Sequence, residues 1–261
     1  MHHATSRFTE STELCADSIE SHPSIPLIFA ESTYQVDQDQ KDALVSSSPA
    51  YTRRGRCNLK KASIDIEGKV TCSIIDSWEG AAVLDTKWCL AKSHEPSPHS
   101  GVLGIADATG CLNLMKLTTE DSQFHLSPWK VWQMNDEGAL CLSLDWSDRG
   151  PNEMATDAKL ILSQSNGTLC MVPSLNSESS LKDEMQVWRA HDYEAWIAAW
   201  DCWSNGNVVW SGGDDLSLKG WDMRMTIQSG SRDPTFTCKR GFDGGITSIQ
   251  SHPHRPHYWA L

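Results

Sequence analysis

One stretch of the chain, residues 190–222, carries the residues that decide the fold. It reads AHDYEAWIAAWDCWSNGNVVWSGGDDLSLKGWD and contains three strand-like runs separated by polar turns. His191 precedes the first run, and Trp221 closes the third run 30 positions later. Short strand-like runs separated by Asn, Asp and Gly turns predict a small antiparallel sheet rather than helices.

The same kind of unit recurs along the chain. SIESHP (18–23) and SIQSHP (248–253) almost superimpose, although they lie 230 residues apart. Three further segments start with small or β-branched residues and close with Trp: VLDTKW (83–88), CLSLDW (141–146) and AWIAAW (195–200). The units start near residues 16, 83, 141, 195 and 246. Short strands with Asn, Asp and Gly turns at this spacing are typical of the four-stranded blades of a β-propeller.

We therefore predict an all-β fold with little helix, since no segment keeps an apolar period of about 3.6 residues over three turns. The predicted organisation is an N-terminal tail at 1–13 and an incomplete propeller at 14–261, with four full blades and the start of a fifth. Within it, DQDQKDALVSSSPAYTRR (37–54) is polar and predicts a mobile insertion. Because a propeller must close its ring, the incomplete fifth unit predicts a fragment or a truncated gene product. The alternative is a closed small propeller.

The motif in residues 190–222 resembles the WD40 repeat, whose hallmark is a Gly-His pair followed by Trp-Asp a few tens of residues later. Ala190 stands where that repeat usually has Gly, and Met115 and Val172 stand at the Trp position of other units. The resemblance implies that four residues form a structural tetrad: His191, Ser211, Asp215 and Trp221. In it the Trp221 indole would donate to the Ser211 hydroxyl, the hydroxyl to the His191 ring, and the ring to Asp215, a buried polar chain that holds the strands together. Ser, His and Asp together also resemble a hydrolase triad. The chain has no G-x-S-x-G or H-E-x-x-H motif, so we interpret these three residues as structural.

Composition excludes several classes of partner. The 261 residues include 22 Lys and Arg against 34 Asp and Glu, a formal net charge of −12. Such a chain lacks the basic face that nucleic-acid phosphates require, so we predict no nucleic-acid ligand. No apolar run approaches the roughly 20 residues of a membrane span, and the N-terminus has no signal-peptide core. Nine scattered cysteines without a C-x-x-C pair indicate reduced thiols, which predicts a cytoplasmic protein without a membrane partner.

Three histidines, His252, His254 and His257, lie close together in the sequence. A zinc site normally combines histidine with cysteine or carboxylate ligands, and the cluster has neither nearby. We therefore predict a solvated turn at this place and no metal site.

Five longer words are more specific than the repeat itself: VLDTKWC (83–89), LGIADATG (103–110), LSLDWS (142–147), AHDYEAWIAAW (190–200) and SGGDDLSLKGWDMR (211–224). Together they resemble the diphthine methylesterase family, also called diphthine methyltransferases, the WD-repeat proteins of diphthamide biosynthesis. Family members continue past the last matching residue, which again implies truncation. The resemblance implies hydrolysis of the methyl ester of diphthine methyl ester, a modified histidine of translation elongation factor 2. That reaction gives diphthine and needs no cofactor.

The implied substrate carries a trimethylammonium group, which aromatic faces and carboxylates hold best. We expect the connection into the fourth unit and the turn between its second and third strands to open on one rim. The candidate base is Glu194 or His191, and the candidate substrate-binding residues are Asp192, Tyr193, Trp196 and Asp214. The alternative is that Asp214 only caps its turn, Trp196 belongs to the core and Tyr193 is an exposed loop residue.

Trp221-Asp222-Met223-Arg224 supports a competing hypothesis, a non-catalytic interaction scaffold. The pattern W-D-x-R is typical of WD40 substrate receptors of cullin-type ubiquitin ligases, in which the Arg docks on the adaptor. Arg224 is then the partner-binding residue, unless it pairs with an acid of its own blade.

Overall fold

Nearly all regular structure in the computed structural model is β-strand, which confirms the predicted all-β class. A turn of 3-10 helix, η1 (Ser147–Arg149), follows one of the strands. Within the described residues, no helix has the length and apolar character that a membrane crossing requires. The structure describes residues 6, 8–38, 51–89, 101–134, 138–149, 158–175, 184–227 and 231–261.

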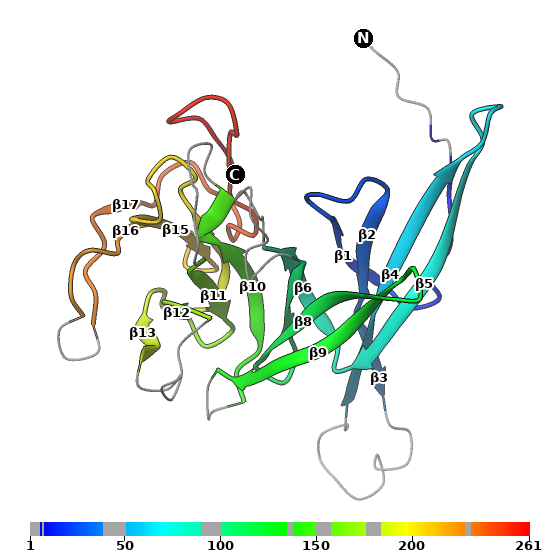
Figure 1. Cartoon of the computed structure of the whole chain (residues 1–261). Coiled ribbons are helices and arrows are strands. Elements are labelled where there is room, and N and C mark those ends of the chain that lie inside the picture. The colour runs from blue at the N-terminus through cyan, green and yellow to red at the C-terminus, as the bar shows by residue number, and fades with distance from the viewer. Residues whose placement is uncertain are drawn as a thin grey trace, which may run out of the picture.

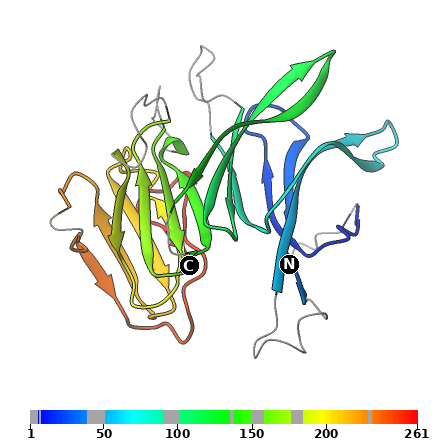
Figure 2. The ribbon, with the colours of Figure 1, turned by 90° about the horizontal axis from the view of Figure 1, so that it is seen from below.

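The strands form antiparallel sheets that stand side by side in chain order (Figure 1 and Figure 2). In the first sheet β1 pairs with β2 and β2 with β4, while β3 and β5 both pair with β4. The next three sheets hold four consecutive strands each, and β18 pairs with β19. The bounds are β1 (Ala16–Ser21), β2 (Ile28–Thr33), β3 (Gln35–Gln38), β4 (Tyr51–Ile64), β5 (Val70–Gly80), β6 (Val83–Trp88), β7 (Val102–Asp107), β8 (Cys111–Glu120), β9 (Gln123–Gln133), β10 (Cys141–Trp146), β11 (Leu160–Gln164), β12 (Thr168–Val172), β13 (Gln186–Arg189), β14 (Ala195–Trp200), β15 (Val208–Gly213), β16 (Leu218–Asp222), β17 (Phe236–Cys238), β18 (Gln250–Ser251) and β19 (Trp259–Ala260).

The first strand of each large sheet carries the same irregularity. Its register with the second strand shifts after the first residue, at Ala16, Val83, Cys141 and Ala195. A β-bulge of this kind bends a strand and increases its twist. Because the bulge falls at the same place in all four sheets, positions that follow it are equivalent from one sheet to the next.

The side chain just after the bulge joins each sheet to the following one. It accepts a backbone N–H from the first strand of the next sheet: Ser18 from Thr86 (3.2 Å), Asp85 from Leu144 (2.9 Å) and Ser143 from Ala198 (3.0 Å). We call these three hydrogen bonds the inter-sheet latches. The equivalent residue of the fourth sheet is Ile197, which has no polar atom in its side chain.

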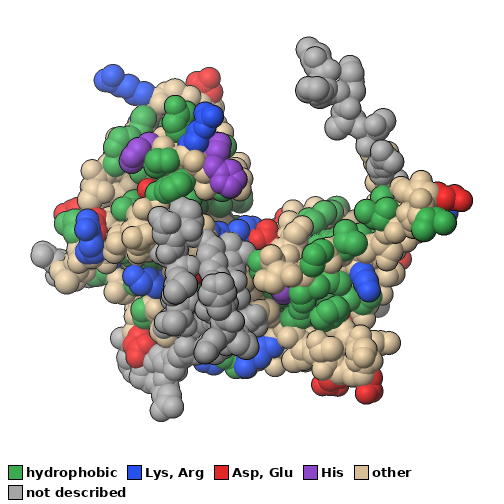
Figure 3. Space-filling view, turned by 45° about the horizontal axis from the view of Figure 1, so that its top comes forward, with side chains coloured by type: hydrophobic (Ala, Val, Ile, Leu, Met, Phe, Trp, Pro, Cys, Tyr) green, Lys and Arg blue, Asp and Glu red, His purple; other side chains and the backbone are tan. Residues whose placement is uncertain are grey.

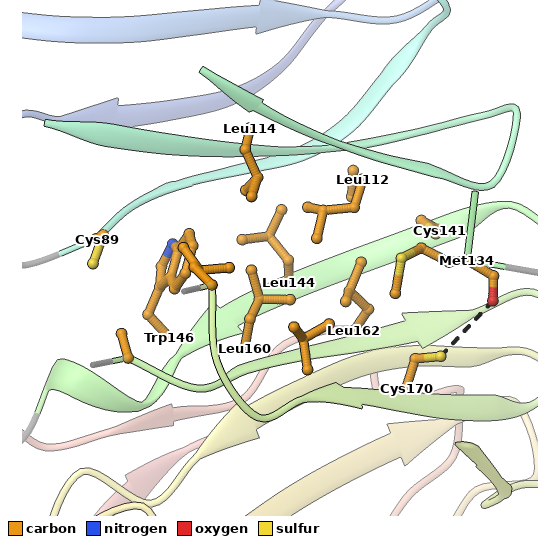
Figure 4. Packing of buried hydrophobic residues seen from close by; sticks show 14 of the residues in the cluster. Cys89, Leu112, Leu114, Met134, Cys141, Leu144, Trp146, Leu160, Leu162 and Cys170 are labelled. Carbon is orange, nitrogen blue, oxygen red and sulfur yellow. Dashed lines mark hydrogen bonds between the residues drawn. The ribbon is translucent and has the colours of Figure 1, made fainter. Parts of the chain in front are cut away.

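Apolar side chains fill the layers between the sheets. Figure 4 shows the layer in which Leu112 and Leu114 of β8 face Leu144, Leu160 and Leu162 of the third sheet. Both faces of β7 and β11 are buried along their whole length. Strands that are covered on two sides need continuous apolar sequence, which explains the words LGIAD and LILSQ.

The core also contains thiols. Cys57, Cys141 and Cys170 are free and buried. Burial raises the pKa of Cys57 to about 11 and that of Cys141 to about 12. These thiols therefore behave as small apolar groups, as the scattered cysteine pattern indicates.

Two segments expected to be irregular contact the first sheet. In the expected tail, Glu10 lies 3.0 Å from the Lys60 Nζ of β4. The expected mobile insertion 37–54 begins and ends in paired strand, because Gln35–Gln38 pairs with the start of β4; residues 39–50 lie outside the described residues. The two ends of the insertion thus join the first sheet through backbone groups, which form the ladder whatever the side chains.

Ser143→Ala should lower the free energy of unfolding by about 1–3 kcal/mol, because it leaves the buried N–H of Ala198 without its acceptor. Urea unfolding followed by tryptophan fluorescence measures the change. Ser73→Ala, on an exposed position of β5, is the control and should stay within about 0.5 kcal/mol of the wild type. Equal stability of the two variants would contradict the role assigned to the latch.

Candidate functional site

Four polar side chains of the fourth sheet form a continuous hydrogen-bonded chain. The Trp221 Nε1–H donates to Ser211 Oγ at 2.9 Å, and Ser211 Oγ lies 2.7 Å from His191 Nε2. The other ring nitrogen, His191 Nδ1, lies 2.9 Å from Asp215 Oδ1. The His191 residue is 1% exposed, and Ser211 and Trp221 are equally covered. The structure thus brings together all four residues that the sequence analysis grouped as a tetrad.

Burial fixes the protonation of this chain. It lowers the pKa of His191, so the neutral ring is favoured. A neutral ring that accepts at Nε2 from Ser211 must carry its proton on Nδ1 and donate it to Asp215. Burial acts to raise the pKa of Asp215, but the hydrogen bond with His191 and the nearby Lys219 outweigh it and keep that pKa below its usual range.

The covered chain bears directly on the candidate bases. Both ring nitrogens of His191 are hydrogen-bonded and the side chain is inaccessible, so the geometry opposes His191 as a general base. Ser211 is fully buried as well and cannot meet a substrate as a nucleophile. Of the two candidate bases, Glu194 is half-buried and lies outside the tetrad.

The remaining candidates lie together on the rim formed by residues 192–196 and 213–216. The Asp214 N–H donates to the Glu194 carbonyl at 3.0 Å, and the Trp196 indole donates to Asp214 Oδ1 at 2.8 Å. Trp196 is half-buried, Asp192 is exposed, and Tyr193 is 65% exposed. Asp214 therefore orients the indole of Trp196 in addition to occupying its turn.

The third sheet supports this rim from one side. Gly167, in the turn between β11 and β12, has a φ of +84°, and a Cβ placed there would lie 2.4 Å from the His191 carbonyl oxygen. Only glycine allows so close an approach in this conformation. Arg189 donates to the carbonyls of Asn166 and Asp192, each at 2.7 Å. The rim loop is thereby held by the backbone of the neighbouring sheet.

Arg224, the candidate partner-binding residue, pairs within its own blade. Its Nε lies 2.9 Å from Asp222 Oδ1, and one terminal nitrogen lies 2.6 Å from Asp222 Oδ2. These hydrogen bonds lower the pKa of Asp222 to about 2. The Arg224 side chain remains 69% exposed, but its guanidinium is already engaged by a carboxylate.

In the first three sheets, the positions equivalent to Ser211 and Trp221 carry other types of side chain. Met115 and Val172 occupy the Trp221 position by strand register, opposite Leu103 and Leu160. In the first sheet the equivalents of Ser211 and Trp221 are Glu31 and Lys60, whose charged atoms lie 2.8 Å apart. The sequence analysis missed this buried pair, because the register that brings the two residues together depends on the long connection between β2 and β4.

Histidine side chains gather near the C-terminal segment at the upper left of Figure 3. The rings of His252 and His254 lie with their centroids 6.2 Å apart. In the described part of the chain, no three His, Cys, Asp or Glu side chains are grouped so that they could hold a metal ion.

Curated proteins resemble nearly the whole chain. It is 36% identical over 254 residues to the diphthine methyltransferase of Mus musculus, covering 95% of the chain and 50% of that protein. It is 34% identical over 268 residues to the Homo sapiens protein of the same name, with coverage of 97% and 55%. The chain is a homologue of the diphthine methyltransferases. The resemblance carried by the five sequence words is confirmed, and the chain spans about half the length of these relatives. No family model matches the sequence.

Solved structures show the fold. Chaetomium thermophilum Sqt1 superimposes with a TM-score of 0.62 at 14% identity, over 91% of this chain and 53% of Sqt1. A chain of an active polycomb repressive complex 2 gives 0.59 at 13% identity, over 94% and 46%. These neighbours are WD40 propellers, so the predicted WD40-type architecture is confirmed, and at such identities the likeness concerns the fold alone.

The tetrad predicts a specific pH dependence of stability. Because burial lowers the pKa of His191, the unfolded chain binds a proton near pH 6.5 that the folded chain disfavours. The contribution of His191 is therefore complete above about pH 6.5 and is lost as the pH falls below it. We expect the urea midpoint to drop between pH 7 and pH 5, and the drop to shrink in His191→Gln but not in the exposed control His254→Gln. An unchanged pH dependence in His191→Gln would be the contrary result.

Proposed function

We propose that this protein hydrolyses the methyl ester of diphthine methyl ester on translation elongation factor 2 and so forms diphthine in diphthamide biosynthesis. The observation that carries the proposal is the 34–36% identity to diphthine methyltransferases over nearly the whole chain. The conserved overall likeness includes the fourth sheet, whose rim concentrates acidic and aromatic side chains. Such a reaction consumes one water and needs no cofactor.

Glu194 is the proposed general base. Its carboxylate takes a proton from a water molecule while the water oxygen bonds to the ester carbonyl carbon. When the tetrahedral intermediate collapses, the bond to the methoxy oxygen breaks, and the proton held by Glu194 passes to that oxygen. The products are methanol and the carboxylic acid of diphthine, which releases its remaining proton to the solvent and becomes the carboxylate. The position of Glu194 supports this role, because the residue is half-buried on the rim and lies outside the covered tetrad.

The neighbouring side chains suit the trimethylammonium group of the substrate. A quaternary nitrogen cannot donate hydrogen bonds and is held by ring faces and negative potential. Tyr193 offers an exposed ring, and Trp196 offers an indole whose orientation is fixed by Asp214. Asp192 adds a second exposed carboxylate to the same rim.

A protein substrate also fits the fold. One of the solved neighbours, Sqt1, is described bound to the N-terminus of ribosomal protein L10, which supports the use of such a propeller for a protein segment. With elongation factor 2 as the partner, the proposed place of action is the cytoplasm. The scaffold hypothesis gains no support from the geometry, because Asp222 occupies the Arg224 guanidinium that a ligase adaptor would need.

Glu194→Gln should reduce the rate of methyl-ester hydrolysis by about 10²–10⁴-fold, the usual contribution of a general base, without unfolding the protein. Mass spectrometry of the modified elongation factor 2 measures the loss of one methyl group. Glu67→Gln, an exposed carboxylate in the turn between β4 and β5, is the matched control and should keep wild-type turnover.

Two results would count against the proposal in different ways. Absence of methyl loss with the wild-type protein, at enzyme concentrations comparable to the substrate, would overturn the reaction. Full turnover by Glu194→Gln would leave the reaction in place and overturn the base.

A further inference from the structure

A cavity of about 460 Å³ lies along β1, β6, β10, β14 and β18. These are the first strands of the five sheets, and we call them the inner strands. Along β14 the cavity is lined by Ile197 to Trp200, and beyond the strand by Cys202, whereas the rim described above surrounds the start of β14 at Ala195 and shares no residue with this lining. The cavity is therefore a separate feature from the candidate ester site. Its charged lining residues are Glu20, Lys87, Asp145 and Arg149.

Five lining residues occupy the same position in five successive sheets. They are Glu20, Lys87, Asp145, Ala199 and Gln250, each placed opposite a residue of its partner strand at the equivalent register. We call these residues the channel ring. Going from the first sheet to the fifth, the charges of the ring are negative, positive, negative and then neutral twice.

Arg149 adds a second positive charge and pairs with two residues of the channel ring, Glu20 and Asp145. One of its terminal nitrogens lies 2.7 Å from Glu20 Oε1, and its Nε lies 3.0 Å from Asp145 Oδ1. Lys87 Nζ lies 2.5 Å from Asp85 Oδ1 on its own strand. The charged lining thus contains two carboxylates and two cations, and its net charge is zero.

A hydrogen bond from a Trp indole to a backbone carbonyl is present in the second and third sheets and, within the described part of the chain, absent in the fourth, beside this cavity. The Trp that closes each inner strand donates to the carbonyl of the preceding ring residue: Trp88 to Glu20 at 3.1 Å and Trp146 to Lys87 at 2.9 Å. Trp200 is the equivalent residue of the fourth sheet and lines the cavity. Its indole Nε1 is buried and has no hydrogen-bond partner among the described residues.

Among its described residues, the fourth sheet lacks three polar features of the sheets before it: the charged ring residue, the inter-sheet latch and the acceptor of the Trp indole. The fourth sheet has Ala199 in place of a charged ring residue, Ile197 in place of a latch and Trp200 without an acceptor. Each of these residues lines the cavity. A buried donor without an acceptor is costly. The indoles of Trp188 and Trp210 also lack one among the described residues, but of these three only Trp200 lines the cavity, beside charged groups of both signs.

We propose that this cavity binds a small zwitterion whose ammonium nitrogen and carboxylate share one carbon, that is, a free α-amino acid. The charged lining is already balanced by its own ion pairs, so a ligand with a single charge would add a net charge, whereas a zwitterion can exchange with these pairs without changing the net charge. Its carboxylate pairs with Arg149 and Lys87, and its ammonium group donates to Glu20 and Asp145. Leu144, Ile197 and Ile249 supply apolar wall for a side chain.

The lining favours a primary ammonium over a trimethylated one. Quaternary nitrogens need aromatic faces, and Trp200 is the single aromatic residue among those that line the cavity. Carboxylates such as Glu20 and Asp145 accept hydrogen bonds, which a primary ammonium offers and a trimethylammonium does not. The site therefore goes beyond the proposed ester hydrolysis and does not rest on it.

Isothermal titration calorimetry with the full chain tests the proposal, with L-leucine as the probe. Three analogues each remove one feature: isovalerate lacks the ammonium, isoamylamine lacks the carboxylate, and N,N,N-trimethyl-leucine lacks the N–H donors. We expect L-leucine to bind at least about tenfold more tightly than each of them, since a charge-assisted pair contributes on this scale. No heat with L-leucine at millimolar concentration would overturn the site. Equal or tighter binding of the trimethylated probe would overturn the assignment to free amino acids.

Variants locate the binding in the cavity. Arg149→Gln should weaken L-leucine binding by at least about tenfold, and Gln250→Phe, at an exposed ring position, should obstruct the cavity if Arg149→Gln fails to fold. Lys61→Gln, an exposed lysine of β4 with the same change of charge, is the control and should bind like the wild type. If Gln250→Phe and a folded Arg149→Gln both bind L-leucine as the wild type does, the ligand binds elsewhere and the proposal is overturned. Ester hydrolysis, measured separately, does not enter this comparison.

Discussion

The arrangement of this propeller depends on one hydrogen bond that is repeated between successive sheets. In each case a β-bulge sets the side chain of Ser18, Asp85 or Ser143 against a backbone N–H of the next inner strand. A buried N–H without an acceptor costs about 1–3 kcal/mol, so the latch strongly favours one register between neighbouring sheets. The cavity combines groups from different sheets, and the rim of the fourth sheet is supported by Gly167 and Arg189 of the third. Both therefore depend on the register in which the sheets are held.

The positions equivalent to Ser211 and Trp221, on the second and third strands of a sheet, are filled in three different ways. The fourth sheet closes the space between β15 and β16 with the Trp221–Ser211–His191 chain, whereas the second sheet uses Ile105 and Met115. The first sheet places the ion pair of Glu31 and Lys60 there. A buried ion pair is stabilised only when further polar contacts compensate its desolvation, and Glu10 and Asn58 supply them. The segment before β1 is consequently part of the first blade.

The sequence predicted those features that are encoded locally. VLDTKW, CLSLDW and AWIAAW coincide with β6, β10 and β14, because alternating apolar residues and a closing Trp are sufficient to mark an inner strand. The tetrad could be grouped for a similar reason, since its spacing is set within one sheet. The channel ring could not be predicted, because it depends on the register between sheets. The accessibility of His191 was equally hidden, since a residue list shows a Ser, His and Asp set without showing that the set is covered.

Repetition offers a way to separate structural side chains from functional ones in this protein. A residue that recurs at an equivalent position serves the shared architecture, and a departure from the repeat needs a separate explanation. Departures at the tetrad position are compensated locally, by apolar packing or by an ion pair. The departures at Ile197, Ala199 and Trp200 fall next to one another, and the Trp200 indole finds no compensating acceptor among the described residues. A packing solution would have removed the orphaned donor, because replacing it with an apolar ring avoids the desolvation cost. Trp188 and Trp210 also retain buried indoles without an acceptor among the described residues, but of the three only Trp200 lines the cavity of balanced charge.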